Sequence, residues 1–306
     1  MVVYATITGM SAAVSPPVIT VTHYSDPGCP WAYSASPALA ALAWRYGAQL
    51  RWDLVMIGLA EDPQLYVDRG YTPDRQAKGY LSFRRFGMPF ATAPRSRVVA
   101  TGRACRAIVA TRLLAPELEY AVFRALQFTQ FCTTELFDTP EGIGAALARV
   151  PGLDAELVLA ELDDPRTEAA YQEDRARTRS AAGGPTEFQG KAAQTDGPVR
   201  FTAPSLQLTH ADGRSLEAGG FQPLEAYDVC IANLDVSLTR RPPAATALEV
   251  LQAFPHGLTT AEVAAIMAPH LTAADTGGTE ESLIDAVAAG EAVRLPLGDD
   301  ALWRVA

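Results

Sequence analysis

The sequence predicts an α/β protein that carries a second, smaller α+β unit at its C-terminus. A strand–helix–strand pattern opens the chain, and a strand–strand–helix pattern follows a long helical block. Short helices and a hairpin come after the Pro- and Arg-rich segment 239–243. We therefore expect an extension over residues 1–17, a main domain over 18–240 with a helical insertion at about 65–182, and a small domain over 244–306.

The opening unit has clear local signals. Residues 18–24 alternate β-branched and polar side chains, which is typical of a strand. Residues 36–46 are rich in Ala and Leu at helical spacing, and Gly47 follows them as a helix-ending residue. Residues 49–59 become almost entirely apolar, as in a buried strand. Together these segments predict a βαβ unit.

The middle of the chain is predicted to be helical, because its apolar residues recur at three- and four-residue spacing. These helices cover 97–114, 118–132, 140–148 and, as one or two helices, 155–179. A loop rich in Gly, Gln and Thr follows, and then a hairpin around Asp212-Gly213 and a closing helix. These later segments cover 183–197, 205–209, 215–218 and 222–234.

The C-terminal unit has the outline of a winged helix. Thr259 to Glu262 forms a capping-box pattern at the start of its second helix. The predicted helices and hairpin strands cover 245–254, 260–267, 280–289, 292–297 and 301–305. Residues 244–306 hold nine acidic and two basic side chains, so a phosphate backbone would be repelled. We expect this unit to dimerise or to cover the main domain rather than to bind nucleic acid.

Composition narrows the class of protein. The 306 residues are 48% hydrophobic and 20% charged, as in an ordinary globular protein, and the net charge of −10 argues against nucleic-acid and anionic membrane partners. The chain has no run of 18 apolar residues, and residues 1–17 lack the basic start of a signal peptide. Its four cysteines are widely spaced and form no disulfide framework. We therefore expect a cytoplasmic protein.

The segment between the first strand and the first helix carries the chemistry. It reads Ser-Asp-Pro-Gly-Cys-Pro-Trp-Ala and places Cys29 at a strand-to-helix turn. The unpaired N–H groups and the positive end of a helix stabilise a thiolate, so we expect a lowered pKa at Cys29. Pro30 suits the first helical turn. Ala32 stands where a Cys-x-x-Cys pair would have its second thiol.

The element order and two motifs resemble the DsbA-like branch of the thioredoxin-fold family. That branch includes FrnE-like thiol oxidoreductases, kappa-class glutathione transferases and 2-hydroxychromene-2-carboxylate isomerases. The motifs are the Cys29 turn and the segment Phe-Thr-Ala-Pro-Ser at 201–205, and the resemblance covers about 17–238. It implies a cis peptide bond at Pro204, which would face the nucleophile. It also implies a substrate site formed by Pro30, Trp31, Ala203 and Pro204.

Three functions remain open. The first is a monothiol thiol–disulfide oxidoreductase in which Cys29 is the nucleophile and an external thiol, glutathione or mycothiol, completes turnover. The second is a glutathione- or mycothiol-dependent isomerase or transferase acting on a small aromatic compound. The third is a non-catalytic binding module. The family's isomerases and kappa transferases carry Ser at the Cys29 position, which favours the first function.

Other residues are candidates for supporting roles. Cys132 is the candidate resolving thiol, because the resemblance places residues 131–138 over the active site; packing in the core is the alternative. His23 lies on the first strand, where it could tune the thiol or serve a structural role. We expect Arg84, Arg85, Arg95 and Arg97 to be solvated, with one of them able to meet a carboxylate of a glutathione-like thiol.

The expected partners are thiol or disulfide substrates and, as a further expectation, a second copy of the chain in a homodimer. No tightly bound cofactor is expected beyond a low-molecular-weight thiol. No metal is expected, because the histidines and cysteines lack metal-ligand spacing.

Overall fold

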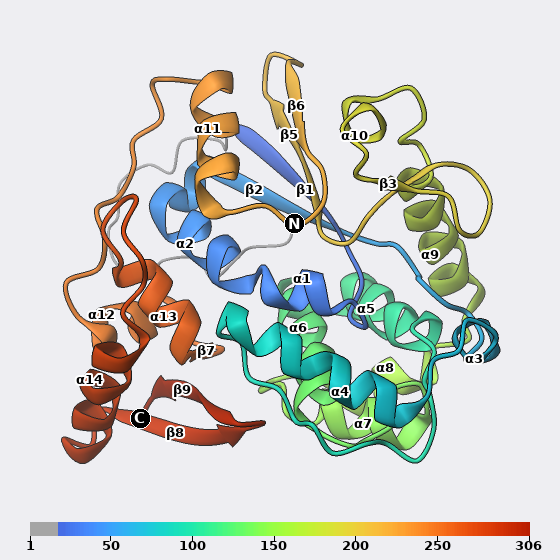
Figure 1. The fold of residues 1–306 in the computed structure, drawn as a ribbon, viewed down its shortest axis with the longest axis horizontal. Coiled ribbons are helices and arrows are strands. Elements are labelled where there is room, and N and C mark those ends of the chain that lie inside the picture. The colour runs from blue at the N-terminus through green and yellow to red at the C-terminus, as the bar shows by residue number, and fades with distance from the viewer. Residues whose placement is uncertain (1–17) are drawn as a thin grey trace.

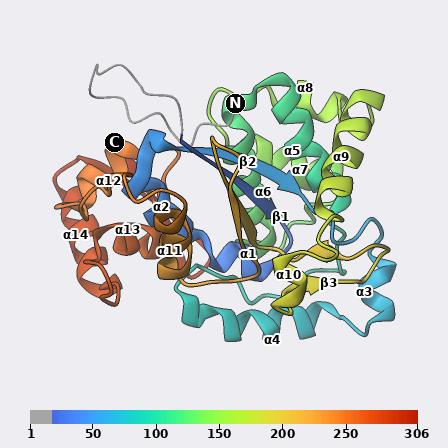
Figure 2. The same cartoon turned by 90° about the horizontal axis from the view of Figure 1, so that it is seen from above.

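A four-stranded mixed sheet forms the centre of the computed structural model, which describes residues 18–306 (Figures 1 and 2). Its strands are β1 (Ile19–Ser25), β2 (Leu50–Met56), β5 (Ser205–His210) and β6 (Ser215–Ala218), in the order β2-β1-β5-β6. β1 runs parallel to β2 and antiparallel to β5. The predicted extension over residues 1–17 lies outside the described residues.

Helices α1 (Pro30–Ser34) and α2 (Ser36–Tyr46) connect β1 to β2, and α11 (Leu224–Leu234) closes the unit. The bounds of α2 confirm the prediction, and Gly47 ends the helix with a positive φ of 50°. β2 ends three residues before the predicted end, because the chain leaves the sheet after Met56. The predicted βαβ and ββα halves are both present.

Most helices lie between the two halves. They are α3 (Gln64–Asp68), α4 (Pro73–Phe83), α5 (Gly102–Leu114), α6 (Glu119–Cys132), α7 (Pro140–Leu147), α8 (Ala155–Ala160) and α9 (Pro165–Thr178). The predicted start of α5 at residue 97 was wrong. Arg97 lies in an irregular segment and donates to both oxygens of the Asp138 carboxylate at 2.7 Å. The predicted loop over 183–197 contains α10 (Pro185–Phe188) and β3 (Ala192–Ala193), which pairs with β4 (Arg200–Phe201).

The C-terminal unit has three helices and a three-stranded antiparallel sheet. They are α12 (Ala247–Ala253), β7 (Leu258–Thr259), α13 (Thr260–Met267), α14 (Thr276–Ala288), β8 (Ala292–Leu297) and β9 (Asp300–Val305). The capping box of Thr259 and Glu262 is confirmed. α14 begins four residues before the predicted start, because Asp275 caps it through the N–H of Gly278. The winged-helix interpretation stays a prediction.

The C-terminal unit packs on the face of α2 that points away from the sheet. Ala40, Ala41 and Trp44 of α2 share one hydrophobic cluster with residues of the C-terminal unit such as Val263 and Trp303. The opposite face of α2 packs in the cluster that contains β1 and β5. α13 lies beside α2 in both ribbon views. The unit therefore covers the main domain, one of the two arrangements that the sequence left open.

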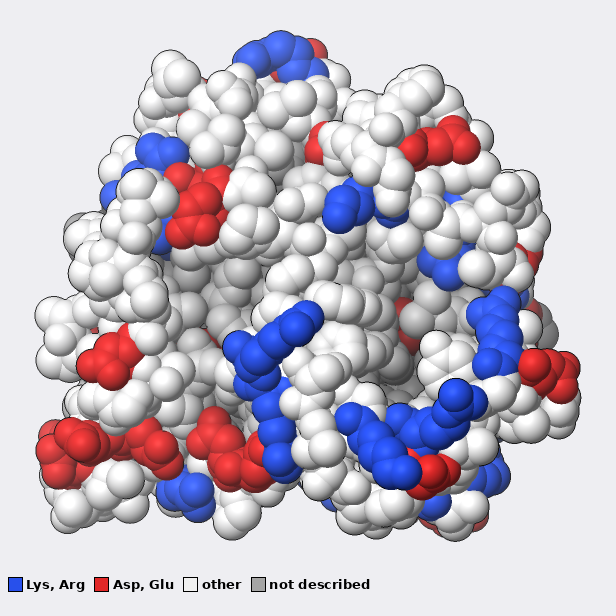
Figure 3. Space-filling view, in the orientation of Figure 1, with Lys and Arg blue, Asp and Glu red and all other residues white. Residues whose placement is uncertain are grey.

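The surface charges differ between the two parts (Figure 3). Acidic side chains gather over the C-terminal unit at the lower left, and basic side chains lie over α4 and its C-terminal end. Uncharged side chains surround the middle of this face, where Figure 1 places α1. Across residues 18–306, no helix combines the length and the apolar character needed to span a bilayer.

Candidate functional site

The turn after β1 is built on a buried carboxylate. Asp26 has no exposed surface, and its Oδ1 accepts a 2.8 Å hydrogen bond from the N–H of Gly28. Its Oδ2 accepts from the N–H of Leu59 at 2.8 Å and from the hydroxyl of Thr101 at 3.0 Å. Burial raises the pKa of Asp26, which these hydrogen bonds oppose. Asp26 thus ties the Cys29 turn to β2 and to the start of α5.

Cys29 caps the N-terminus of α1 with extended backbone geometry, and Pro30 follows at the first helical position. The thiol is 7% exposed and donates to the carbonyl oxygen of Ala203 at 3.2 Å. Burial raises the pKa of Cys29 to about 12, while the backbone N–H groups of Ala32 and Trp31 act in the opposite direction. The expected low pKa was therefore wrong for this state, because desolvation outweighs the helix N-terminus.

The backbone that faces Cys29 belongs to the segment before β5. The Ala203–Pro204 peptide bond is cis, and the Ala203 carbonyl is the one that Cys29 contacts. Ser205 holds this segment in place, because its hydroxyl donates to the Thr202 carbonyl at 2.7 Å and accepts from the N–H of Gly220 at 3.0 Å. The structure thus brings Cys29, Ala203 and Pro204 together from opposite ends of the main domain.

Trp31 is the exposed member of an aromatic cluster beside the turn. Its side chain is 40% exposed, and its ring lies 4.9 Å from Phe83, 5.6 Å from Phe86 and 5.4 Å from Phe221, measured between ring centroids. The helical insertion supplies Phe83 and Phe86, whereas Phe221 follows β6. The sequence showed no periodic signal that would place these three phenylalanines next to Trp31.

Two cations near the cluster form no ion pair within residues 18–306. Arg85 stacks on Phe86, with its guanidinium carbon 4.8 Å from the ring centroid. Lys191 is exposed, and its side chain runs beside Gly220. A Cβ atom added to Gly220 would lie 3.2 Å from the Cδ of Lys191. Its carbonyl accepts from the Thr202 hydroxyl at 2.7 Å. Either cation is available to a carboxylate at the mouth of the site.

The other arginines that the sequence singled out have structural partners. Arg84 pairs with Asp299 at 2.7 Å, and Arg97 pairs with Asp138. Arg95 was expected to be solvated, and this was wrong. It is 7% exposed, and its guanidinium donates to backbone carbonyls at the C-terminal end of α6, including that of Thr133 at 3.1 Å.

Cys132 is the last residue of α6 and lies in a different environment from Cys29. Its Sγ is 3.3 Å from the Tyr33 hydroxyl and 3.2 Å from the carbonyl of Pro89. Burial raises its pKa to about 12. The two thiols share neither a hydrogen bond nor a hydrophobic cluster, and all four cysteines are free. The resolving role of Cys132 stays a prediction that this arrangement does not support.

Of two further titratable side chains, His23 was a sequence candidate and Tyr66 was not. His23 is buried against Phe123, and burial lowers its pKa to about 3, so it stays neutral and structural. Tyr66 of α3 was missed by sequence reasoning. Burial raises its pKa, and so do the nearby Asp26 and Cys29. Tyr66 is therefore neutral, and it comes from a short helix with no sequence motif.

The sequence matches no known family model and no curated protein. Solved structures do share the fold. A Nitrosomonas europaea protein assigned as a disulfide isomerase has a TM-score of 0.54 and 17% identity, covering 71% of this chain and 97% of its own. The cytosolic disulfide reductase DsbM from Pseudomonas aeruginosa has a TM-score of 0.51 and 20% identity, and the match covers 71% of this chain and 100% of that one. A Streptomyces coelicolor protein assigned as a DsbA oxidoreductase has a TM-score of 0.51 and 20% identity, and the match covers 74% of this chain and 92% of that one.

At these identities the likeness shows the fold. The chain therefore has a DsbA-like thioredoxin fold.

Proposed function

We propose that this protein is a thiol–disulfide oxidoreductase of monothiol type, with Cys29 as its nucleophile. The observation that carries the proposal is the 3.2 Å contact between the Cys29 thiol and the Ala203 carbonyl beside Pro204. A substrate that lies along this backbone would bring its sulfur to the thiol. The solved structures with this fold, which bear names of disulfide-exchanging enzymes, support the same reaction class.

The chemistry requires the thiol to lose its proton and leave the Ala203 carbonyl. The Cys29 thiolate then attacks one sulfur of a disulfide, forms a mixed disulfide and releases the other half as a thiolate. The N–H groups of Trp31 and Ala32 favour the thiolate form of Cys29. They also favour its departure in the second step, because a stabilised thiolate is a better leaving group.

Ala32 decides how turnover ends. Its methyl group cannot attack the mixed disulfide, so an external thiolate must do so, which frees Cys29 and joins the two outer sulfurs in a new disulfide. The unpaired cations Arg85 and Lys191 support an external thiol that carries carboxylates, such as glutathione. Mycothiol remains the alternative, and a tightly bound cofactor is not required.

The aromatic cluster around Trp31 favours a second candidate, a thiol-dependent transferase or isomerase that acts on a small aromatic compound. Aromatic rings stack on such a surface and gain about 0.5–1.5 kcal/mol per pair beyond the area that they bury. In this reaction the external thiol is itself the nucleophile, so Cys29 would not be needed as one.

One assay series separates the two candidates. Glutathione-dependent reduction of 2-hydroxyethyl disulfide should fall at least about a hundredfold in Cys29→Ser, since a hydroxyl cannot replace the thiolate. Cys132→Ser and the matched control Cys230→Ser should stay within about twofold of the parent rate. Mass spectrometry should detect one glutathione bound to Cys29 as a mixed disulfide.

Full disulfide exchange in Cys29→Ser would contradict the proposal. Conjugation of glutathione to 1-chloro-2,4-dinitrobenzene by the parent and by Cys29→Ser at equal rates, without disulfide exchange, would establish the second candidate instead.

A further inference from the structure

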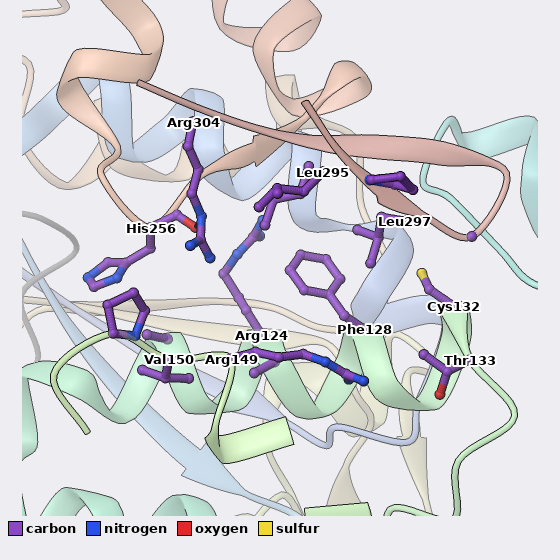
Figure 4. Close-up of a pocket in the computed structure, with 16 residues that line it drawn as sticks. Arg124, Phe128, Cys132, Thr133, Arg149, Val150, His256, Leu295, Leu297 and Arg304 are labelled. Atoms are coloured by element: carbon purple, nitrogen blue, oxygen red, sulfur yellow. Dashed lines mark hydrogen bonds between the residues drawn. The ribbon is translucent and has the colours of Figure 1, made fainter. Parts of the chain in front are cut away.

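A cavity lies away from Cys29, between α6 and the β8–β9 hairpin (Figure 4). Its volume is about 400 Å³, within the range of roughly 300–1,000 Å³ that small-molecule sites occupy. The helical insertion forms one wall and the C-terminal unit forms the other. Cys29, Trp31 and Pro204 do not line this cavity, so it is separate from the site described above.

The charges on the cavity wall are all positive. Arg124, Arg149 and Arg304 line it, and no Asp or Glu does. Two of these arginines are neutralised by carboxylates outside the cavity lining. Arg124 pairs with the buried Glu262, and Arg149 pairs with Glu135 at 2.9 Å.

Arg304 has no such partner within residues 18–306. Its Nε donates to the His256 carbonyl at 3.2 Å, which leaves its two terminal nitrogens available. Figure 4 shows its side chain reaching into the cavity from β9 while Arg124 rises toward it from α6. Burial and the proximity of Arg124 both lower the pKa of Arg304, and burial lowers the pKa of His256, so the imidazole is neutral and Arg304 is the cavity cation that has no carboxylate partner among residues 18–306.

This placement is unusual for its surroundings. Residues 244–306 contain only two basic side chains, Arg294 and Arg304, against nine acidic ones. Arg294 lies over the ring of Trp303 at 5.5 Å. The other basic residue of this acidic unit, Arg304, thus points into the cavity (Figure 4).

Part of the cavity lining is apolar. Phe128, Leu297 and Leu302 form this part together with the Cys132 thiol. Arg124 stacks on Phe128, with its guanidinium carbon 4.9 Å from the ring centroid, so cationic and apolar side chains adjoin in the lining. Figure 4 shows Leu297 beyond Phe128, on the side away from His256. A ligand that matched this lining would carry one anionic group and an apolar body.

We propose that this cavity binds a small organic anion with an aromatic or short aliphatic body, of the arylalkyl carboxylate class. The carboxylate would accept hydrogen bonds from the terminal nitrogens of Arg304, and the apolar body would lie against Phe128 and Leu297. Charge-assisted pairing supplies orientation, and burial of the apolar body supplies the remaining affinity.

Titration calorimetry with 4-phenylbutyrate tests this, with 4-phenylbutanol as the uncharged probe. The parent protein should bind the carboxylate, and Arg304→Gln should bind it about tenfold more weakly, the loss expected for one charge-assisted hydrogen bond. Arg294→Gln removes a cation from the same unit outside the cavity and should change the affinity by less than twofold. Binding of the alcohol should be the same in all three proteins.

A second pair of variants, Leu295→Glu and Leu295→Gln, tests the proposal even if Arg304→Gln fails to fold. Leu295 lines the cavity and is 40% exposed, so substitution there spares the core. Leu295→Glu should repel 4-phenylbutyrate and weaken its binding more than the isosteric Leu295→Gln does. Equal affinity of the parent, Arg304→Gln and Leu295→Glu would overturn the proposal. Loss of binding in Cys29→Ser would overturn it too, because the probe would then occupy the Cys29 site.

Discussion

The two thiols of the central region, Cys29 and Cys132, have the same resting protonation but different surroundings. Both are buried, both lie about 3.2 Å from a backbone carbonyl oxygen, and burial raises the pKa of each to about 12. Cys29 lies at the N-terminus of a helix, where N–H groups point toward the sulfur. Cys132 ends α6, where unpaired carbonyls give the helix its negative end. Asp299 and Asp300 raise its pKa further.

The comparison shows that burial alone does not mark a reactive thiol. What distinguishes Cys29 is the set of donors that would stabilise its thiolate once water or substrate reached it. Cys132 has one hydroxyl, that of Tyr33, and a surrounding of Phe128 and Phe131. The following predictions sharpen or break this distinction, and all of them can be read by site-resolved alkylation.

The pH profile carries the largest expected effect. Only the thiolate is alkylated, so a pKa near 12 instead of the ordinary 9.0 lowers the thiolate fraction at neutral pH about a thousandfold. Iodoacetamide labelling of both thiols should be slow at pH 7 and accelerate steadily through the alkaline range. A plateau below pH 8.5 at Cys29 alone would show that its helix N-terminus outweighs burial; the urea-unfolded protein gives the reference rate.

Glu262→Gln should loosen the surroundings of Cys132. Glu262 is fully buried and pairs with Arg124, so its loss leaves an uncompensated buried cation and should lower the free energy of unfolding by about 3 kcal/mol. Urea unfolding measures this, and labelling should accelerate at Cys132 more than at Cys29. The surface pair of Glu249 and Arg241 gives the control, because Glu249→Gln should cost under about 1 kcal/mol. Equal costs for both variants would contradict the prediction.

Asp26→Asn should act on the other thiol. The Asp26 charge is among the causes that raise the pKa of Cys29. Its removal should lower that pKa and speed labelling of Cys29 at neutral pH several-fold, while Cys132 keeps its rate. The N–H groups of Gly28 and Leu59 donate to different oxygens of Asp26, so Asn keeps an acceptor for one of them and loses the other. An unchanged Cys29 profile would mean that Asp26 is neutral in the folded protein.

Tyr33→Phe should have the smallest effect. It removes the hydroxyl that contacts Cys132 and the Pro89 carbonyl, at a cost of about 1 kcal/mol in unfolding free energy. The Tyr33 hydrogen bond lowers the pKa of Cys132, so labelling of Cys132 should become slower still. A change in Cys29 labelling would show that the two thiols are linked through α1.

Local sequence signals predicted most of the fold. The strands, α2 and the capping box of α13 follow from alternation, helical spacing and capping residues within a few positions of one another. The start of α5 was wrong because Arg97 bonds to Asp138, which lies 41 residues further along the chain. Such a pair leaves no periodic trace in the sequence.

The candidate site was likewise predictable where a short motif encodes it and unpredictable where distant segments meet. Cys29 and the proline opposite it came from two short motifs. The aromatic cluster came from three segments that meet only in the folded chain, and Tyr66 comes from a five-residue helix. The pKa of Cys29 was mispredicted for a physical reason, since the sequence shows the helix N-terminus but not the depth at which the fold buries the sulfur.

Helix α2 has a further consequence for how the molecule behaves. One of its faces belongs to the core beneath the sheet and the other to the core of the C-terminal unit. If either part unfolded alone, one apolar face of α2 would be exposed to solvent. Calorimetry should therefore record a single cooperative transition. A chain shortened before residue 244 would present Trp44 and the alanines beside it to solvent and should self-associate.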